Sequence, residues 1–293
     1  MENVKKTHKI GSIIELLRVR QYTKNLLIAL PAFLAIQSQW IDVVAGVFVF
    51  SMLASAVYCI NDAKDAIADS YHPKKQYRPI PSNRISEKEA LQLAGLLIIS
   101  SFSTSWYFGL GITSLLLAYL IINVFYSTIA KELAGVDVLI VSIGFFIRTL
   151  VGLEFVKQPE TLYWILWPLF LASLSLSIGK RYSKLSLQNS DNRTSKLYTD
   201  KLLLGLLLST SFITVYFSTI LLNENIYSLI KYSGLNADIV NVISLVLIIL
   251  YSRCIFLITY RKCEPATIFF SDKPIIFGLF SCAIIISFVL KGP

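Results

Sequence analysis

Histidine, cysteine and charged residues are all scarce in this chain of 293 residues. The two histidines, His8 and His72, are too few for a histidine-based metal site. The four cysteines include no pair with the spacing of a zinc site or of a disulfide framework. Charged residues make up 15% of the chain, whereas a soluble domain usually carries about 25%. These shortages argue against zinc modules, disulfide-stapled folds and soluble domains.

Hydrophobic residues, in contrast, make up 55% of the sequence and are gathered into long runs. A helix needs ~20 mainly apolar residues to cross a bilayer. Only helices and closed barrels satisfy backbone polar groups in lipid, and runs that are continuous rather than alternating favour helices. We therefore predict an all-α, polytopic membrane protein that forms a single domain over residues 1–293. Its nine predicted transmembrane helices are residues 25–40, 42–60, 89–105, 107–127, 137–156, 161–179, 202–222, 239–260 and 274–290.

The distribution of positive charge predicts the orientation of these spans. Most of the 27 Lys and Arg residues lie in the N-terminal segment and in the loops after the second, fourth, sixth and eighth spans. The opposite side holds Lys157, Lys231 and Lys291. Because positively charged loops stay in the cytoplasm, we expect a multi-pass protein of the cell membrane with its N-terminus inside and its C-terminus outside. Topology thus accounts for the net charge of +9, and the sequence carries no nucleic-acid-binding motif.

An acidic motif follows the second predicted span. Asn61, Asp65 and Asp69 recur every four residues, so on a helix they share one face, and Asp62 adjoins that face. Stacked carboxylates repel one another unless a cation lies among them. Mg²⁺ prefers hard oxygen ligands and commonly bridges carboxylates to substrate phosphates. The motif is therefore a candidate Mg²⁺-diphosphate site, and the alternative is a solvated helix end.

A basic, proline-punctuated segment at residues 72–84 comes directly after the acidic motif. Lys and Arg are the usual partners of phosphate, and Arg makes bidentate contacts. An acidic stripe followed by such a segment can hold both a metal ion and the phosphates that the ion binds. The preference for positive cytoplasmic loops explains the sign of this charge but not its position beside the carboxylates.

These residues resemble a known family. The pattern Asn-Asp-x-x-Asp-x-x-x-Asp is similar to the first aspartate-rich motif of the UbiA superfamily of intramembrane prenyltransferases. Residues 61–80 also resemble the signature N-D-x-x-D-x-x-x-D-x-x-H-P-x-K-x-x-R-P-I of its decaprenyl-phosphate phosphoribosyltransferase branch, with every fixed position filled. Residues 18–25 resemble that branch's R-P-x-Q-W-x-K-N, from which Val19 and Tyr22 depart. Asn83 replaces a common glycine, and Asn also tolerates a left-handed turn.

The second long cytoplasmic loop separates the branches of this superfamily. Aromatic-substrate prenyltransferases carry a second D-x-x-x-D motif there, whereas this chain reads Gly-Lys-Arg-Tyr at residues 179–182. Asp191 and Asp200 are isolated. The Gly-Lys-Arg-Tyr element resembles the phosphoribosyltransferase branch. A cationic cluster in place of a carboxylate pair suits a substrate with more phosphate and less metal.

The resemblance implies a UbiA-like helical bundle and a transferase activity. The implied reaction moves 5-phosphoribose from phosphoribosyl diphosphate to a polyprenyl phosphate (decaprenyl or undecaprenyl phosphate), depends on Mg²⁺, releases pyrophosphate and serves cell-envelope glycan synthesis. Asn61, Asp62, Asp65 and Asp69 would hold the metal, and the three aspartates would be catalytic. The implied substrate-binding residues are Lys24, Asn25, Lys75, Arg78, Tyr126, Lys131, Arg148, Lys180, Arg181 and Tyr182.

Two features near these residues stay open. An arginine inside a span, such as Arg148, is costly and usually faces a cavity or a partner, so the alternative to a site role is a structural pair with Asp137. Glu264 and Asp272 resemble the last cytoplasmic loop of the family and receive no role. The expected partners are the two substrates and the bilayer, with a homo-oligomer as a further option and no nucleic acid.

Two other functions compete with phosphoribosyl transfer. A UbiA-type prenyltransferase would use a prenyl diphosphate donor and an aromatic or lipid acceptor, and the missing second aspartate motif argues against it. A transporter or scaffold is the non-enzymatic alternative. A transporter favours a polar site at the membrane midplane with broken helices, whereas the polar residues here gather at the cytoplasmic ends of the predicted spans.

Overall fold

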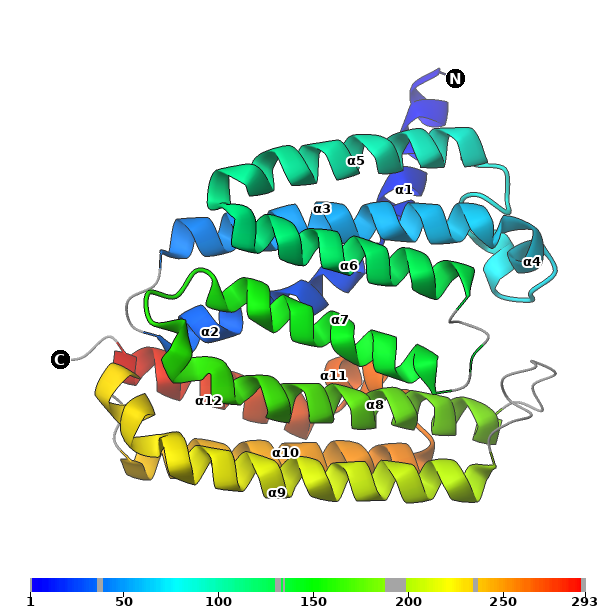
Figure 1. Ribbon diagram of the computed structural model, residues 1–293. Coiled ribbons are helices and arrows are strands. Elements are labelled where there is room, and N and C mark those ends of the chain that lie inside the picture. The colour runs from blue at the N-terminus through cyan, green and yellow to red at the C-terminus, as the bar shows by residue number, and fades with distance from the viewer. Residues whose placement is uncertain are drawn as a thin grey trace.

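The computed structural model describes residues 2–35, 39–129, 133, 135–187, 199–233 and 237–290, and the elements within them are helices. The long helices lie side by side (Figure 1). In chain order the elements are α1 Glu2–Leu16, η1 Val19–Ile28, α2 Ala29–Leu34, α3 Trp40–Lys64, α4 Ala66–Ser70, η2 Lys75–Tyr77, α5 Glu87–Phe108, α6 Leu110–Thr128, α7 Val136–Leu153, η4 Pro159–Ile165, α8 Leu166–Leu187, α9 Asp200–Ser233, α10 Ala237–Arg261, α11 Pro265–Ser271 and α12 Lys273–Leu290.

Seven helical segments in the described residues are long and apolar enough to cross a membrane. Each overlaps a predicted span, and α12 overlaps the last one. These candidate spanning segments are 40–64, 87–108, 110–128, 136–153, 159–185, 200–225 and 237–261. The all-α prediction is thus confirmed, whereas the total of nine spans remains a prediction.

The first predicted span, residues 25–40, is not one continuous helix in its described part. The chain runs as the 3₁₀ helix η1 to Ile28 and then as the short helix α2, which ends at Leu34. Both lie against α7 at Gly152, where an added Cβ atom would be only 2.2 Å from the carbonyl oxygen of Ile28. Close packing of backbone on backbone therefore holds this segment against α7.

Two helices form the centre of the bundle. In α3 and α7, 61% of the most apolar window is buried, compared with 17% in α5 and 22% in α6. The largest core cluster contains buried side chains of α3, α6 and α7, including Phe50, Leu116 and Val151. The outer helices therefore keep apolar side chains on the surface, which suits a lipid environment.

The loops that carry the acidic motif and the basic segments lie at one end of the bundle. The end of α3, the start of α5, the end of α6, the start of α7 and the end of α8 lie at the same end (Figure 1). Asn83 has a φ of 57° there, which confirms the expected tolerance of a left-handed turn. A capping box then starts α5, in which Ser86 and Glu89 satisfy each other's backbone N–H groups. The left-handed residue and the capping box together set the direction in which the chain passes from the basic segment into α5.

Candidate active site

The acidic motif straddles a break between two helices. α3 ends at Lys64, Asp65 has φ −90° and ψ 2°, and α4 begins at Ala66. The helical course nevertheless continues, because the Asp65 N–H donates to the carbonyl oxygen of Asn61 at 2.9 Å and the Asp69 N–H to that of Asp65 at 2.8 Å. Asp62 and Asp69 are therefore two turns apart on one face. Both are buried, with 4% and 2% of their surfaces exposed.

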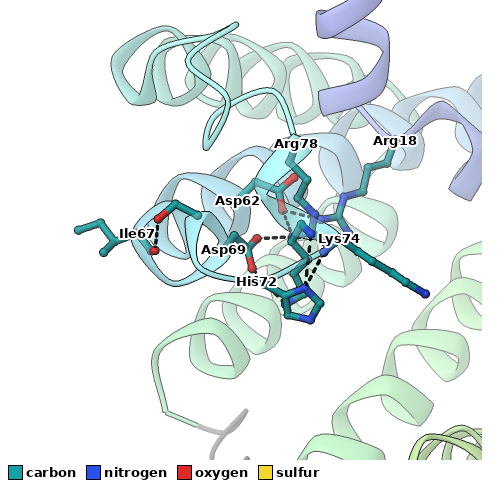
Figure 2. Close-up of polar contacts among 9 residues, drawn as sticks. Arg18, Asp62, Ile67, Asp69, His72, Lys74 and Arg78 are labelled. Carbon is teal, nitrogen blue, oxygen red and sulfur yellow. Dashed lines mark hydrogen bonds and ion pairs between the residues drawn. The ribbon is translucent and has the colours of Figure 1, made fainter. Parts of the chain in front are cut away.

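Cations of the basic segment neutralise these two carboxylates. Arg78 donates from Nη1 to Asp69 Oδ2 at 2.5 Å and to Asp62 Oδ1 at 3.2 Å, so one guanidinium lies between both acids (Figure 2). The ammonium of Lys75 is 3.0 Å from Asp69 Oδ1. Arg18, at the start of η1, donates to Asp62 Oδ1. The expected juxtaposition of acidic motif and basic segment is thus observed in the fold.

His72 shapes the basic segment. Its Nδ1 accepts hydrogen bonds from the backbone N–H groups of Lys74 at 3.2 Å and Lys75 at 3.4 Å (Figure 2). This turn brings Lys75 and Arg78 back towards Asp69. His72 therefore has a local structural role.

The other two members of the acidic motif are Asn61, which contacts α6, and Asp65, which is partly exposed to solvent. Asn61 Oδ1 accepts a hydrogen bond from Ser127 Oγ, and the Lys64 ammonium donates to the Ser127 carbonyl oxygen at 2.8 Å. Asp65 is half-buried at the helix break. Tyr126 is half-buried next to Ser127. Lys131, another expected substrate-binding residue, lies outside the described residues.

Arg148 is buried inside the bundle with 5% of its surface exposed. Its Nε donates to Asn25 Oδ1 at 2.8 Å, its Nη1 to the Gly144 carbonyl oxygen at 2.6 Å and its Nη2 to Tyr119 Oη at 3.2 Å. The guanidinium also lies 5.0 Å from the centre of the Phe50 ring, close enough for a cation–π contact. Arg148 therefore ties α7 to the η1 segment that carries Lys24 and Asn25.

The alternative pairing of Arg148 with Asp137 is wrong. Asp137 in the first turn of α7 instead accepts a hydrogen bond from Arg181 of α8. Helical geometry explains the difference, because positions 137 and 148 are about three turns apart on one helix, whereas the end of α8 lies beside the start of α7. Asn25 takes the place of the carboxylate partner, and its Nδ2 donates in turn to Ser51 Oγ at 2.9 Å.

Each residue of the Lys-Arg-Tyr element on α8 has a different partner. The Lys180 ammonium is 3.5 Å from Glu264 Oε1, in the loop between α10 and α11. Arg181 pairs with Asp137. Tyr182 is buried in the core shared by α8, α9 and α10, and its hydroxyl accepts a hydrogen bond from Lys262. Lys180 and Arg181 are therefore partly exposed, whereas Tyr182 is buried.

Positive charge concentrates around Lys24. Displacement of water by the surrounding protein, followed by repulsion from Lys180, Arg148 and Arg18, lowers the Lys24 pKa to about 8, against a weaker opposite effect of Glu264. Such crowding of cations without a matching number of acids is an electrostatic cost unless an anion binds among them. Cations from the start of η1, from α7 and from α8 thus lie near one another around Lys24.

The basic end of α8 is electrostatically coupled to the segment that binds the acidic motif. Lys184 lies within electrostatic range of Lys180, Glu264 and Lys75, and Lys75 in turn pairs with Asp69. A rim of charged side chains therefore runs from the carboxylates to the cation cluster. The sequence analysis did not predict several members of this network. Arg18 belongs to a recognised motif but received no site role. Ser127, Tyr119 and Lys262 lie in no motif that marks them as site residues.

The donor set fits a magnesium ion held together with substrate. In the described parts of the chain, no three His, Cys, Asp or Glu side chains are gathered into a protein-only metal cage. Mg²⁺ does not require one, because it is usually bound by one or two carboxylates, water and substrate phosphates. Asp62 and Asp69 supply two such carboxylates, and a cation, the guanidinium of Arg78, already lies between them.

Residues 25–194 match the UbiA prenyltransferase family. The chain belongs to this family. It is 36% identical over 186 residues to a decaprenyl-phosphate phosphoribosyltransferase of Mycolicibacterium smegmatis, a match that covers 61% of this chain and 58% of that protein. A protein of the same name from Corynebacterium glutamicum is 33% identical over 184 residues, which cover 60% of this chain and 55% of that one.

The fold is likewise that of the family. A UbiA homologue from Archaeoglobus fulgidus, solved with GPP and Mg²⁺, superposes with a TM-score of 0.75 at 18% identity, and the match covers 96% of this chain and 99% of that one. Family membership and the apolar helices together make the chain a multi-pass membrane protein. The matched region spans less than two thirds of the curated relatives' length.

Proposed function

We propose that this chain transfers 5-phosphoribose from phosphoribosyl diphosphate to a polyprenyl phosphate and releases pyrophosphate. The observation that carries the proposal is a pair of adjoining sites with different charge. Asp62 and Asp69 form an acidic site, and Lys24, Arg148 and Lys180 interact electrostatically in a cationic region. Within that region, Lys180 and its neighbour Arg181 stand where aromatic prenyltransferases would place a second aspartate motif. A donor with a diphosphate and a separate phosphate matches both, and the relatives' names agree.

The acidic site would bind the diphosphate of the donor through Mg²⁺. Asp62 and Asp69, with Asn61 and Asp65 beside them, would hold the ion, which neutralises charge on the departing pyrophosphate when it is bound. Arg78 already touches both buried carboxylates. Its guanidinium therefore stands next to the place where phosphate oxygens would arrive, and charge-assisted hydrogen bonds to them are within reach.

The chain needs no general base for this reaction. The acceptor is a phosphate oxygen that is already ionised at neutral pH. It would attack C1 of the ribose, and the bond from C1 to the diphosphate oxygen would break with its electron pair leaving on pyrophosphate. The protein would contribute positioning and charge screening by its cations. A single in-line displacement would invert the anomeric centre.

A prenyltransferase that uses a prenyl diphosphate is the second candidate. The family name and the structure of the Archaeoglobus homologue with GPP favour it. The Lys180-Arg181 pair speaks against it, because both side chains are basic where a second metal would need carboxylates. The nearby acids Glu264 and Asp137 each pair with one of these cations.

The deciding experiment compares donors with purified protein. Labelled phosphoribosyl diphosphate, undecaprenyl or decaprenyl phosphate and Mg²⁺ should give a phosphoribosyl lipid and pyrophosphate. A prenyl diphosphate with 4-hydroxybenzoate should give no product. If the prenyl donor is used and the phosphoribosyl donor is not, the branch assignment fails and family membership alone remains. We further propose the cytoplasmic face of the cell membrane as the place of reaction and cell-envelope glycan synthesis as its purpose.

A further inference from the structure

Glu264 is an acid at the edge of a cation-lined site. It lies in the loop between α10 and α11, and its Oε1 is 3.5 Å from the Lys180 ammonium. Both side chains remain accessible, with 40% of Glu264 and 49% of Lys180 exposed. Pairs this open contribute little to stability. The fold of α8 therefore does not depend on this contact, which leaves the carboxylate available for a ligand.

The backbone of Glu264 is fixed, while its side chain stays partly exposed beside Lys180. Its carbonyl oxygen accepts hydrogen bonds from the N–H groups of Thr267 at 2.9 Å and Ile268 at 3.3 Å, in the first turn of α11. Two residues earlier, Lys262 turns the chain with a φ of 55° and places its ammonium 3.6 Å from the centre of the Tyr182 ring. The loop is thus anchored on both sides of Glu264.

Charged neighbours link this carboxylate electrostatically to the cations that bind the acidic motif. Lys24 and Lys184 both lie within electrostatic range of Glu264. Lys24 is close to Arg18, which binds Asp62, and Lys184 is close to Lys75, which binds Asp69. Asp62, Asp69 and Glu264 are thus each paired with a cation, and these cations lie within electrostatic range of Lys24 or Lys184. A ligand that spans the site would have phosphate at the cations and its remaining groups near Glu264.

An acid in such a place is unfavourable for a purely anionic or apolar ligand. A carboxylate repels phosphate, and it has nothing to bind on a prenyl chain. Hydroxyl groups, in contrast, donate strong hydrogen bonds to carboxylates, and an acidic side chain is a common partner of ribose hydroxyls. From this geometry we propose that Glu264 accepts hydrogen bonds from the ribose hydroxyls of the donor and thereby determines the choice of a sugar donor. This inference rests on the proposed phosphoribosyl transfer.

The test measures donor selectivity instead of activity alone. The kcat/KM for phosphoribosyl diphosphate is compared with that for its 2-deoxy and 3-deoxy analogues, with undecaprenyl phosphate as acceptor. The wild type should prefer the full ribose over at least one analogue by about tenfold or more, the scale of a hydrogen bond to a charged group. Glu264→Ala should lose this preference because turnover of the full donor falls while turnover of that analogue stays. Glu264→Gln, which keeps an acceptor oxygen, should retain part of it.

Lys180→Gln is the matched control, because it removes the partner of Glu264 without removing the carboxylate. This variant should lower turnover of all three donors by a similar factor and keep the preference. Equal selectivity in Glu264→Ala and the wild type would overturn the inference and leave Glu264 as a positioning residue for Lys180. A wild type that discriminates against neither deoxy analogue would overturn it as well. If the wild type transfers nothing from phosphoribosyl diphosphate, the proposed function fails, and this inference fails with it.

Discussion

At the end of α3 every buried acid is matched by a cation, whereas around Lys24 the cations outnumber the acids. Asp62 and Asp69 are held by Arg18, Arg78 and Lys75. Among the described residues, neither Lys24 nor Arg148 forms an ion pair with a carboxylate within 4 Å, and Arg148 is held by neutral acceptors and aromatic rings instead. In the first region the protein's own cations balance the buried carboxylates, whereas the second region has more positive than negative charge.

This difference indicates how the two regions meet a phosphorylated donor. In the acidic region, a metal ion and phosphates would exchange partners with cations that are already there, so the net charge changes little. In the region around Lys24, a phosphate would supply negative charge that the protein lacks. Binding to the second region is therefore expected to depend more steeply on pH and on ionic strength.

The comparison requires both regions to face the same side of the membrane. An impermeant thiol reagent should reach Lys74→Cys, in the basic segment, and the half-buried native Cys263 beside Glu264, only from the cytoplasmic side. In a variant whose Cys263 is replaced by Ser, Pro293→Cys should react only from outside, because nine spans and the positive-inside distribution place the ends on opposite sides. Labelling of Lys74→Cys and Cys263 from opposite sides would separate the two regions and break the proposed site.

Asp69→Asn should abolish most of the activity. The substitution removes a buried charge that Arg78 and Lys75 contact and that would face Mg²⁺. We expect kcat/KM to fall by about a hundredfold or more, the scale on which lost electrostatic contacts at a reacting centre act. EDTA should silence the wild type for the same reason. Glu160→Gln, an exposed acid in η4, is the control and should be neutral. Near-normal turnover of Asp69→Asn in Mg²⁺ buffer would rule out the metal site.

Arg78→Ala should weaken donor binding more than acceptor binding. The guanidinium lies between the two acids that would carry the diphosphate, so its loss should raise the donor KM about tenfold, the value of a charge-assisted hydrogen bond. Lys74→Ala removes a neighbouring charge that is exposed and should change the donor KM little. If Arg78→Ala instead loses affinity for polyprenyl phosphate alone, the assignment of the two phosphate sites is reversed.

Sequence reasoning predicted those parts of the site whose residues are adjacent in the chain. Helical periodicity put Asp62 and Asp69 on adjoining positions, and adjacency in the chain put the basic segment beside them. The direct contact of Arg78 with both acids was not part of the prediction. The spans follow from hydropathy, which reports the lipid environment directly. Asn83 was expected to tolerate a left-handed turn, and it has that conformation.

Contacts between distant segments were beyond such reasoning. Arg148 binds Asn25 across 123 positions, and Lys180 meets Glu264 across the α9–α10 hairpin. Neither pairing has a periodic signal, because the packing of whole helices sets both. Helix packing also explains why the first span, predicted as one helix, is instead formed by η1 and α2 in its described part. Hydropathy does not reveal that Gly152 of α7 lets the η1–α2 backbone approach so closely.

The smallest expected effect concerns Lys24 and tests directly whether the region around it lacks negative charge, unlike the region at the end of α3. Its pKa of about 8 lies below the usual 10.5, first because the protein displaces water and then because Lys180, Arg148 and Arg18 repel its charge. The ammonium is therefore lost as the pH rises through about 8, while an unfolded chain would keep it to about 10.4. By linkage, charged Lys24 lowers the stability of the fold below pH 8, and this penalty disappears between those pKa values.

Binding of phosphate should show the opposite trend. Between pH 7 and pH 9 the wild type should lose affinity severalfold for one of its two phosphorylated substrates, as measured by KM, because phosphate stays ionised while Lys24 becomes neutral. Lys24→Arg is the matched variant, since a guanidinium stays charged over this range, and its KM should be nearly constant. Parallel profiles for Lys24→Arg and the wild type would mean that Lys24 does not bind phosphate. A loss confined to the donor would assign the region around Lys24 to the donor's 5-phosphate, and a loss confined to the lipid would assign it to the acceptor.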